Sequence, residues 1–194
     1  MTLANKITIT RILLIPVFVL FAVYYGRSIE EGRPEEWQRW AAVAVFIVAS
    51  VSDCLDGWVA RHWNGYSKLG AVLDPIADKG LLLTAIITLS LSKWTYAFPL
   101  WFPVLVIARD AVVLTGCALV KYFNGHLEVH PSWTGKIATA LQMVAIAWVM
   151  LQLPQYLYSV YAAGFFTLVS GLGYVFDGVR QLKHHDTPAP PKGT

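Results

Sequence analysis

Charged side chains are scarce in this sequence. Asp, Glu, Lys and Arg together make up 14% of its 194 residues, whereas a soluble globular domain carries about 25%. Hydrophobic residues make up 56%, and the mean hydropathy is +0.53. A protein with so few charges does not face water over most of its surface. The composition therefore excludes an ordinary soluble domain and indicates a membrane protein.

Cysteine is also scarce, and the net charge is small. The two cysteines, Cys54 and Cys117, lie in apolar stretches without a paired spacing, and we interpret them as free thiols packed in helices. A formal net charge of +3 gives no indication of a nucleic-acid partner. The first apolar run begins after Arg11 and has no small-residue cleavage pattern behind it, so we interpret it as a membrane span and not as a signal peptide.

Long apolar stretches, by contrast, are abundant. A helix needs about 20 apolar residues to cross the hydrocarbon core of a bilayer, which is about 30 Å thick. Six stretches meet or nearly meet this length, and polar or Pro-containing segments separate them. We therefore predict an all-α integral membrane protein with six transmembrane helices and a short interfacial segment, TLANKITITR, at the N-terminus. The predicted helices cover roughly residues 10–26, 38–60, 71–92, 98–121, 134–153 and 156–179.

The distribution of Lys and Arg predicts how these helices are oriented. Most basic residues fall near the two termini and the loops on the same side, whereas Arg27, Arg33 and Arg39 share a loop with four Glu residues on the other side. Because basic residues concentrate in cytoplasmic loops, we predict that both termini lie inside. We expect a bacterial cytoplasmic membrane as the location if the source is bacterial, and an inner mitochondrial membrane if it is eukaryotic. We expect one membrane domain over residues 1–182 and a disordered cytoplasmic tail over residues 183–194.

The most informative stretch is SDCLDGWVARHWNGYSKLGAVLDPIADKG, residues 52–80. Its four aspartates form two pairs, one with a spacing of three residues and the other of four, and each spacing places both side chains on one face of a helix. Two lie at the end of one predicted helix and two at the start of the next, and a short turn joins these antiparallel helices. Four carboxylates that converge in this way repel one another unless cations hold them, and oxygen ligands favour hard cations such as Mg²⁺, Mn²⁺ or Ca²⁺. The candidate ligands are Asp53, Asp56, Asp74 and Asp78.

Small residues and one arginine share the same helical faces. Gly57 and Gly70 leave room for a ligand to approach the backbone closely, and Ala60 keeps the same groove open. Arg61 offers a bidentate fork for a phosphate oxygen. Metal-binding carboxylates beside a small-residue groove and an arginine indicate a nucleotide diphosphate as the ligand.

This stretch resembles the signature of the CDP-alcohol phosphatidyltransferases, D-x2-D-G-x2-A-R-x8-G-x3-D-x3-D, at every fixed position. The chain length, the six predicted spans, an N-x2-T-x2-R start and a later G-K-x2-T-x2-Q motif extend the resemblance. It implies an enzyme that moves the phosphatidyl group of CDP-diacylglycerol to an alcohol and releases CMP. It also implies that the four aspartates hold a two-metal centre with Mg²⁺ or Mn²⁺, and that Asp78 is the general base.

The resemblance further implies which residues contact the nucleotide. Gly57, Arg61 and Ser67 match family positions that contact the CDP moiety, and Asn5 and Thr8 at the start of the first span are further candidates. Family members are commonly homodimers, so a second copy of the chain is an expected partner besides the lipid substrate and the bilayer.

The acceptor alcohol depends on residues outside the signature. Arg109 and Asp110 lie inside the fourth predicted span, and Lys136 lies near the cytoplasmic start of the fifth. Ionisable residues at membrane depth are functional candidates, so we expect Arg109 and Lys136 to form a cationic pocket for a phosphate-bearing acceptor. The alternative is that Arg109 pairs with a neighbouring acid and Lys136 anchors the helix at the interface.

Two branches of the family fit these residues, and both acceptors stay open. The segment LGAVLDPIADKG is most similar to bacterial phosphatidylglycerophosphate synthases, which use glycerol-3-phosphate, and this branch is our first choice. Those enzymes typically have Arg-Glu in place of Arg109-Asp110, a further Arg near Thr115, and a second Lys where Ala138 stands. Arg-Asp followed by HPSWTGKIATALQ resembles the cardiolipin synthases, whose acceptor is phosphatidylglycerol.

A membrane cation carrier is the remaining alternative from another functional class, with the aspartates as an ion path. Against it, the aspartates gather near one face of the membrane and form no column across it. A cationic Arg61 inside a cation path would also repel the ion.

Overall fold

The computed structural model describes residues 3–62, 70–124 and 133–184 and, within these ranges, the side chains of residues 9–52, 79–116 and 133–176. The described part of the chain is all-α, without a strand, which confirms the prediction of an all-α protein with six helices. The helices are α1 (Leu3–Glu30), α2 (Glu36–His62), α3 (Gly70–Leu91), α4 (Trp101–Asn124), α5 (Trp133–Met150) and α6 (Tyr156–His184).

The first helix is longer at both ends than the apolar stretch that predicted it. It includes most of the predicted interfacial segment, and it continues through charged residues up to Glu30. The chain turns away from the helix at Gly32, whose φ of 70° is left-handed. There the Gly32 amide donates to the Ile29 carbonyl and the Arg33 amide to the Ser28 carbonyl, both at 3.0 Å. This pair of bonds is a Schellman motif, and glycine is the residue that adopts its left-handed position at least cost.

The fifth helix ends three residues earlier than predicted, at Met150. Its end is also a Schellman motif, in which the Leu153 amide donates to the Trp148 carbonyl at 3.1 Å and the Gln152 amide to the Val149 carbonyl at 3.0 Å. Gln152 holds the left-handed position with a φ of 52°, which is uncommon for a residue other than glycine. Its side-chain amide donates to the Tyr25 hydroxyl at 2.8 Å, so a contact with α1 accompanies this backbone conformation.

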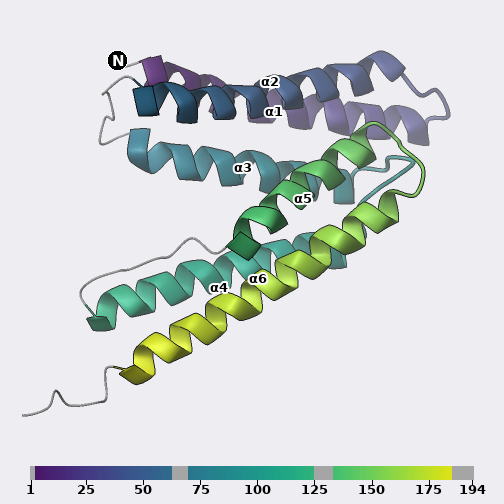
Figure 1. Ribbon diagram of the computed structural model, residues 1–194. Helices are drawn as coiled ribbons and strands as arrows, with labels where there is room; N and C mark the ends of the chain where they lie inside the picture. Colours follow the sequence, from purple (N-terminus) through teal and green to yellow (C-terminus); the bar gives the residue numbers. More distant parts are fainter. Residues whose placement is uncertain (1–2, 63–69, 125–132, 185–194) are drawn as a thin grey trace, which may run out of the picture.

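The six helices alternate in direction along the bundle. Figure 1 shows that the odd-numbered helices begin, and the even-numbered helices end, towards the same side as the N-terminus. Helix α1 packs on α2 and α3, whereas α6 packs on α4 and α5. These two groups of helices meet where α3 contacts α4 and α5, and where α2 contacts α5.

The described hydrophobic core lies towards the end of the bundle opposite the N-terminus. It is built from the C-terminal halves of α1, α3 and α5 and the N-terminal halves of α2, α4 and α6. Trp94, between α3 and α4, is buried there and donates its indole N–H to the Ala22 carbonyl at 2.9 Å. Representative core side chains are Phe18, Phe46, Ile86, Phe102, Ile146 and Val160.

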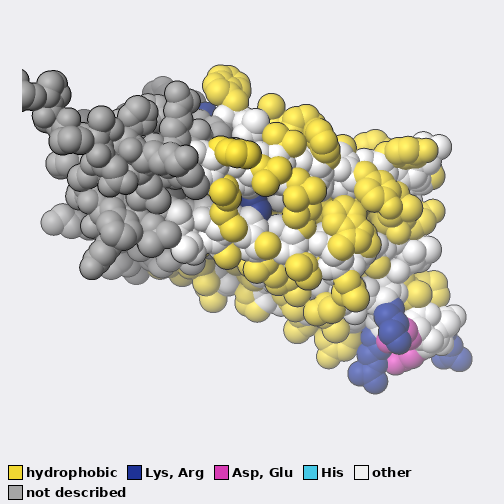
Figure 2. All heavy atoms as spheres, turned by 90° about the horizontal axis from the view of Figure 1, so that it is seen from below, with side chains coloured by type: hydrophobic (Ala, Val, Ile, Leu, Met, Phe, Trp, Pro, Cys, Tyr) yellow, Lys and Arg dark blue, Asp and Glu magenta, His cyan; other side chains and the backbone are white. Residues whose placement is uncertain are grey.

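The outer surface is strongly apolar. Large side chains such as Leu114 (64% exposed) and Phe176 (72% exposed) point away from the core. Figure 2, a view from below relative to Figure 1, shows hydrophobic side chains spread widely over the described surface. Soluble monomers rarely expose apolar patches above about 600 Å². Within the described residues, Ile9–Glu30 of α1 and Tyr156–Phe176 of α6 are long and apolar enough to cross a membrane, and Lys79–Leu91 is a shorter apolar stretch.

The close approach of α1 to the turn after α3 predicts a cost for Gly26→Ala. An added Cβ would lie 3.1 Å from the Lys93 backbone nitrogen and 3.1 Å from the Ser92 Cβ. Because the turn must shift to make room, we expect the free energy of unfolding to fall by about 1–3 kcal/mol, the usual cost of overpacking. The measurement is the midpoint of thermal unfolding in detergent.

Gly116→Ala in α4 is the matched control for this substitution. A Cβ at Gly116 would meet no described heavy atom within 4 Å, and alanine has the higher helix propensity. The control should unfold at the wild-type temperature or slightly above it. Equal midpoints for the two variants would contradict the packing described at Gly26.

Candidate functional site

Apart from Ser67, the predicted metal and nucleotide residues belong to helical segments at one end of the bundle. The C-terminal part of α2, the N-terminal part of α3 and the first turns of α1 meet at the side of the N-terminus (Figure 1). The backbone of each of the following residues lies in one of these helical segments: Asn5, Thr8, Asp53, Asp56, Gly57, Arg61, Gly70, Asp74 and Asp78.

The side chains of these nine residues, and the whole of Ser67, lie outside the described part of the structure. Their roles as metal or nucleotide ligands therefore stay predictions. Among the side chains that are described, no group of three or more His, Cys, Asp or Glu could hold a metal ion. The four aspartates of the signature remain the candidate metal ligands.

Two adjoining cavities lie beside this end of the bundle, between α3 and the α4–α6 group. The larger has a volume of about 530 Å³, and the smaller has a volume of about 270 Å³. Lys79, Arg109, Thr139 and Met143 line both. Lys136 lines the larger cavity, so the structure brings Arg109 and Lys136, which are far apart in sequence, to the walls of one cavity.

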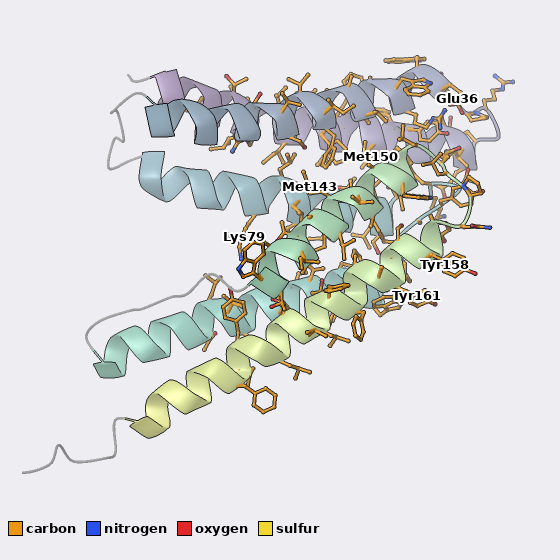
Figure 3. All side chains as sticks on the ribbon, viewed as in Figure 1. Glu36, Lys79, Met143, Met150, Tyr158 and Tyr161 are labelled. Carbon is orange, nitrogen blue, oxygen red and sulfur yellow. The ribbon has the colours of Figure 1, made fainter. Side chains whose placement is uncertain are left out.

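A carboxylate shared by two cations forms the polar centre of these cavities. The Asp110 Oδ1 accepts a hydrogen bond from the Arg109 Nη1 at 2.7 Å, and the Lys79 Nζ lies 3.0 Å from the same oxygen. Figure 3 shows Lys79 extending from α3 towards α4. The pairing of Arg109 with a neighbouring acid, expected as the alternative to ligand binding, is therefore present, and it coexists with a place on the cavity wall.

Helix α6 fixes the other side of the Arg109 guanidinium. The Arg109 Nη2 donates to the Ser170 hydroxyl at 3.0 Å, and the guanidinium carbon lies 5.5 Å from the centre of the Tyr174 ring. Gly171 leaves room for this arrangement, since a Cβ there would lie 3.4 Å from the Arg109 Cγ. With only 12% of its side chain exposed, Arg109 is held in place, and an arginine so held can present its remaining N–H donors to an anion.

The smaller cavity is lined by further polar groups. Arg11 is fully buried and lines this cavity together with Gln142. The Gln142 side-chain amide donates to the Thr167 hydroxyl at 2.8 Å, which in turn donates to the Ala163 carbonyl at 2.7 Å. These bonds satisfy polar groups in a buried region, which would otherwise carry a desolvation cost.

Basic side chains predominate among the described residues that line the two cavities. They are Lys79, Arg109 and Lys136, together with Arg11 in the smaller cavity, and the acidic one is Asp110. Basic side chains that line one cavity together raise the local concentration of anions. The arrangement can therefore bind a small anionic group with more than one negative charge.

Sequence reasoning missed Lys79 and Arg11 as residues of this site, and it noted Asp110 beside Arg109 without giving it a role. A signal for each was present, because all three are ionisable residues inside or at the edge of an apolar segment. Lys79 directly follows the signature aspartate Asp78, and Arg11 is the last residue of the N-x2-T-x2-R start. What could not be seen was that these residues and Arg109 line one cavity.

Comparison with known proteins gives a consistent result. Residues 1–174 match the family described as CDP-alcohol phosphatidyltransferase. The chain is 36% identical over 146 residues to proteins named CDP-diacylglycerol–glycerol-3-phosphate 3-phosphatidyltransferase from Escherichia coli strain K12, Escherichia coli O157:H7 and Shigella flexneri serotype 5b. The similar region covers 74% of this chain and 74% of each relative.

Proposed function

Because the chain belongs to the CDP-alcohol phosphatidyltransferase family, we propose that it transfers the phosphatidyl group of CDP-diacylglycerol to glycerol-3-phosphate. The products are phosphatidylglycerophosphate and CMP. The observation that carries this choice of acceptor is the cationic cavity lined by Lys79, Arg109 and Lys136. The names of the relatives support the same acceptor.

The charge of the acceptor favours glycerol-3-phosphate. A phosphate monoester carries nearly two negative charges at pH 7, since its second pKa is about 6. The phosphodiester of phosphatidylglycerol carries one. The basic side chains of Lys79, Arg109 and Lys136 on the larger cavity match the dianion better, and the Arg109 fork suits two of its phosphate oxygens.

Synthesis of cardiolipin from phosphatidylglycerol is the second candidate. Val113, Ala140 and Met143 give the larger cavity an apolar wall, which suits a lipid acceptor. A cation carrier, in contrast, has no support, because the family consists of transferases.

The four signature aspartates would hold Mg²⁺ or Mn²⁺. Their backbone positions lie on α2 and α3 at one end of the bundle, and a set of carboxylate oxygens is what these hard cations require. When bound, the two metal ions neutralise charge on the diphosphate of the lipid nucleotide.

The chain's own residues would then position the acceptor and move its proton. Lys79 and Arg109 bind the acceptor phosphate, and Lys79 is adjacent in α3 to Asp78, so the acceptor hydroxyl is held near the base. Asp78 takes the hydroxyl proton as the oxygen attacks the phosphorus that carries diacylglycerol. The bond from this phosphorus to the CMP oxygen breaks, and CMP leaves with that electron pair.

The same proposal places the enzyme in the membrane with its active end at the cytoplasmic face. The exposed apolar surface and the two helices long enough to cross a bilayer support it. We propose that all six helices span the membrane, that both termini are cytoplasmic, and that residues 1–182 form one domain of a homodimer.

An acceptor assay with the purified enzyme tests the proposed function. With CDP-diacylglycerol and Mg²⁺ or Mn²⁺, we expect CMP release with glycerol-3-phosphate and none with phosphatidylglycerol. Lys136→Ala should raise the KM for glycerol-3-phosphate about tenfold, since it removes one charge-assisted hydrogen bond.

Lys93→Ala is the matched control, because it removes a lysine that pairs with Glu30 at the opposite end of the bundle. It should leave the KM unchanged. CMP release with phosphatidylglycerol alone would establish the second candidate in place of the first. CMP release with neither acceptor would contradict both candidates and would mean that the acceptor is another alcohol.

A further inference from the structure

We propose that Asp110 is a positioning residue for the acceptor phosphate. It holds Lys79 and Arg109 in a fixed arrangement in the cavity and does not touch the substrate itself. This role rests on the proposed function and deepens it, because it names the residue that prepares the acceptor site.

The geometry at Asp110 is that of a shared anchor. A single carboxylate oxygen, Oδ1, accepts from the Arg109 Nη1 at 2.7 Å and lies 3.0 Å from the Lys79 Nζ. Arg109 is the neighbour of Asp110 in α4, whereas Lys79 comes from α3. The carboxylate therefore brings cations from two helices to one point on the cavity wall.

Lys79 depends on this anchor more than Arg109 does. Its side chain is 49% exposed, and the flexible four-carbon stem of a lysine otherwise samples many rotamers. The bond to Asp110 uses one of the three N–H donors of the ammonium group and leaves two for a ligand. Asp110 thus restricts where the Lys79 charge lies without consuming its capacity to bind.

Among the described residues, Arg109 has a second support and Lys79 has none. Its Nη2 donates to Ser170, and its guanidinium lies over the Tyr174 ring. Each terminal nitrogen still retains one N–H after these bonds. The part of Asp110 is to balance the charge of two cations that would otherwise repel each other while the cavity is empty of acceptor.

The expected consequence is preorganisation of the acceptor site. A ligand binds more tightly when the groups that contact it are already ordered, because the cost of ordering them is not incurred on binding. Removing the Asp110 charge should therefore weaken binding of the acceptor and leave binding of the lipid nucleotide unchanged. A bond that merely tied α3 to α4 would show no such selectivity.

The test compares Asp110→Asn with the wild-type full-length enzyme in detergent, with CDP-diacylglycerol, Mg²⁺ and glycerol-3-phosphate. We expect the KM for glycerol-3-phosphate to rise about tenfold, with the KM for CDP-diacylglycerol and kcat changed by less than about threefold. Asp110→Glu should restore most of the acceptor KM. Glu31→Gln, which removes the carboxylate of an exposed pair with Arg27, should change neither KM.

A second variant shows whether Asp110 acts through Lys79. Lys79→Met keeps the stem and removes the charge at a half-exposed position, so it should fold normally and raise the acceptor KM. Adding Asp110→Asn to it should have a clearly smaller effect than the same substitution in the wild type, as in a double-mutant cycle between coupled residues.

Several results would overturn the role of Asp110. One is an unchanged acceptor KM in Asp110→Asn while the wild type uses glycerol-3-phosphate. Another is a loss of kcat alone, which would make Asp110 a catalytic residue. Equal increases in both KM values with a lower unfolding temperature would mean that Asp110 only stabilises the packing of α3 on α4. If Asp110→Asn does not fold, an unchanged acceptor KM in Lys79→Met decides against the role. A wild type inactive with glycerol-3-phosphate would instead refute the proposed function on which it rests.

Discussion

Asp78→Asn should abolish phosphatidyl transfer while leaving the protein folded in the membrane. An amide neither takes a proton from the acceptor hydroxyl nor binds a hard cation as a carboxylate does. A general base alone contributes about 10²–10⁴-fold to a rate, and the loss of a metal ligand adds to this. We expect kcat for CMP release to fall by at least about 10³-fold. The unfolding midpoint in detergent should change little.

Asp110→Asn is the matched control for this result. It makes the same change from acid to amide on the neighbouring helix, yet the proposed role of Asp110 predicts that kcat survives at saturating glycerol-3-phosphate. Comparable kcat losses in both variants would argue for a general electrostatic effect. Turnover like that of the wild type in Asp78→Asn would contradict the assignment of Asp78 as the base.

The number and order of the helices could be predicted because they depend on local properties of the chain. Apolar length and the polar breaks between stretches are visible in the sequence. The ends of the helices were harder. Gly32 explains why α1 ends at Glu30 and not at the end of the apolar stretch. A glycine shortly after an apolar stretch is a known signal for the end of a helix, and it was visible in the sequence. The end of α5 has no such signal, because Gln152 takes the left-handed position and contacts Tyr25 from α1.

The candidate site also has features that are visible in the sequence and features that depend on tertiary packing. The aspartate stripe rests on a spacing of about one helix turn, which is visible in the sequence, and it stays a prediction because these side chains lie outside the described part. The link between Lys79 and Asp110 could not be predicted, because it joins α3 to α4 through tertiary packing. The support of Arg109 by Ser170 joins positions 61 residues apart. Arg109 was singled out for its charge at membrane depth, and only the packing of α6 on α4 shows what holds it.

The second large effect is expected for Asp53→Ala, which removes one of the predicted metal ligands from α2. Losing a group that only supports a metal ligand lowers metal affinity about 10–100-fold, and the loss of the ligand itself should cost at least as much. A ligand present at about 100 times its Kd stabilises the folded state by about 2.7 kcal/mol. A hundredfold weaker complex would lose most of this stabilisation.

The measurement is the increase in unfolding temperature of Asp53→Ala on adding Mn²⁺ together with CDP-diacylglycerol. We expect a clear increase in the wild type and in the control Glu31→Gln. The carboxylate of Glu31 pairs with Arg27 just after the C-terminal end of α1, far from the predicted metal ligands. Asp53→Ala should show little or none, and a chelator should remove the increase from the wild type. An increase of wild-type size in Asp53→Ala would count against Asp53 as a metal ligand. An increase in the wild type that survives the chelator would count against any metal at this site, because the lipid nucleotide would then bind without one.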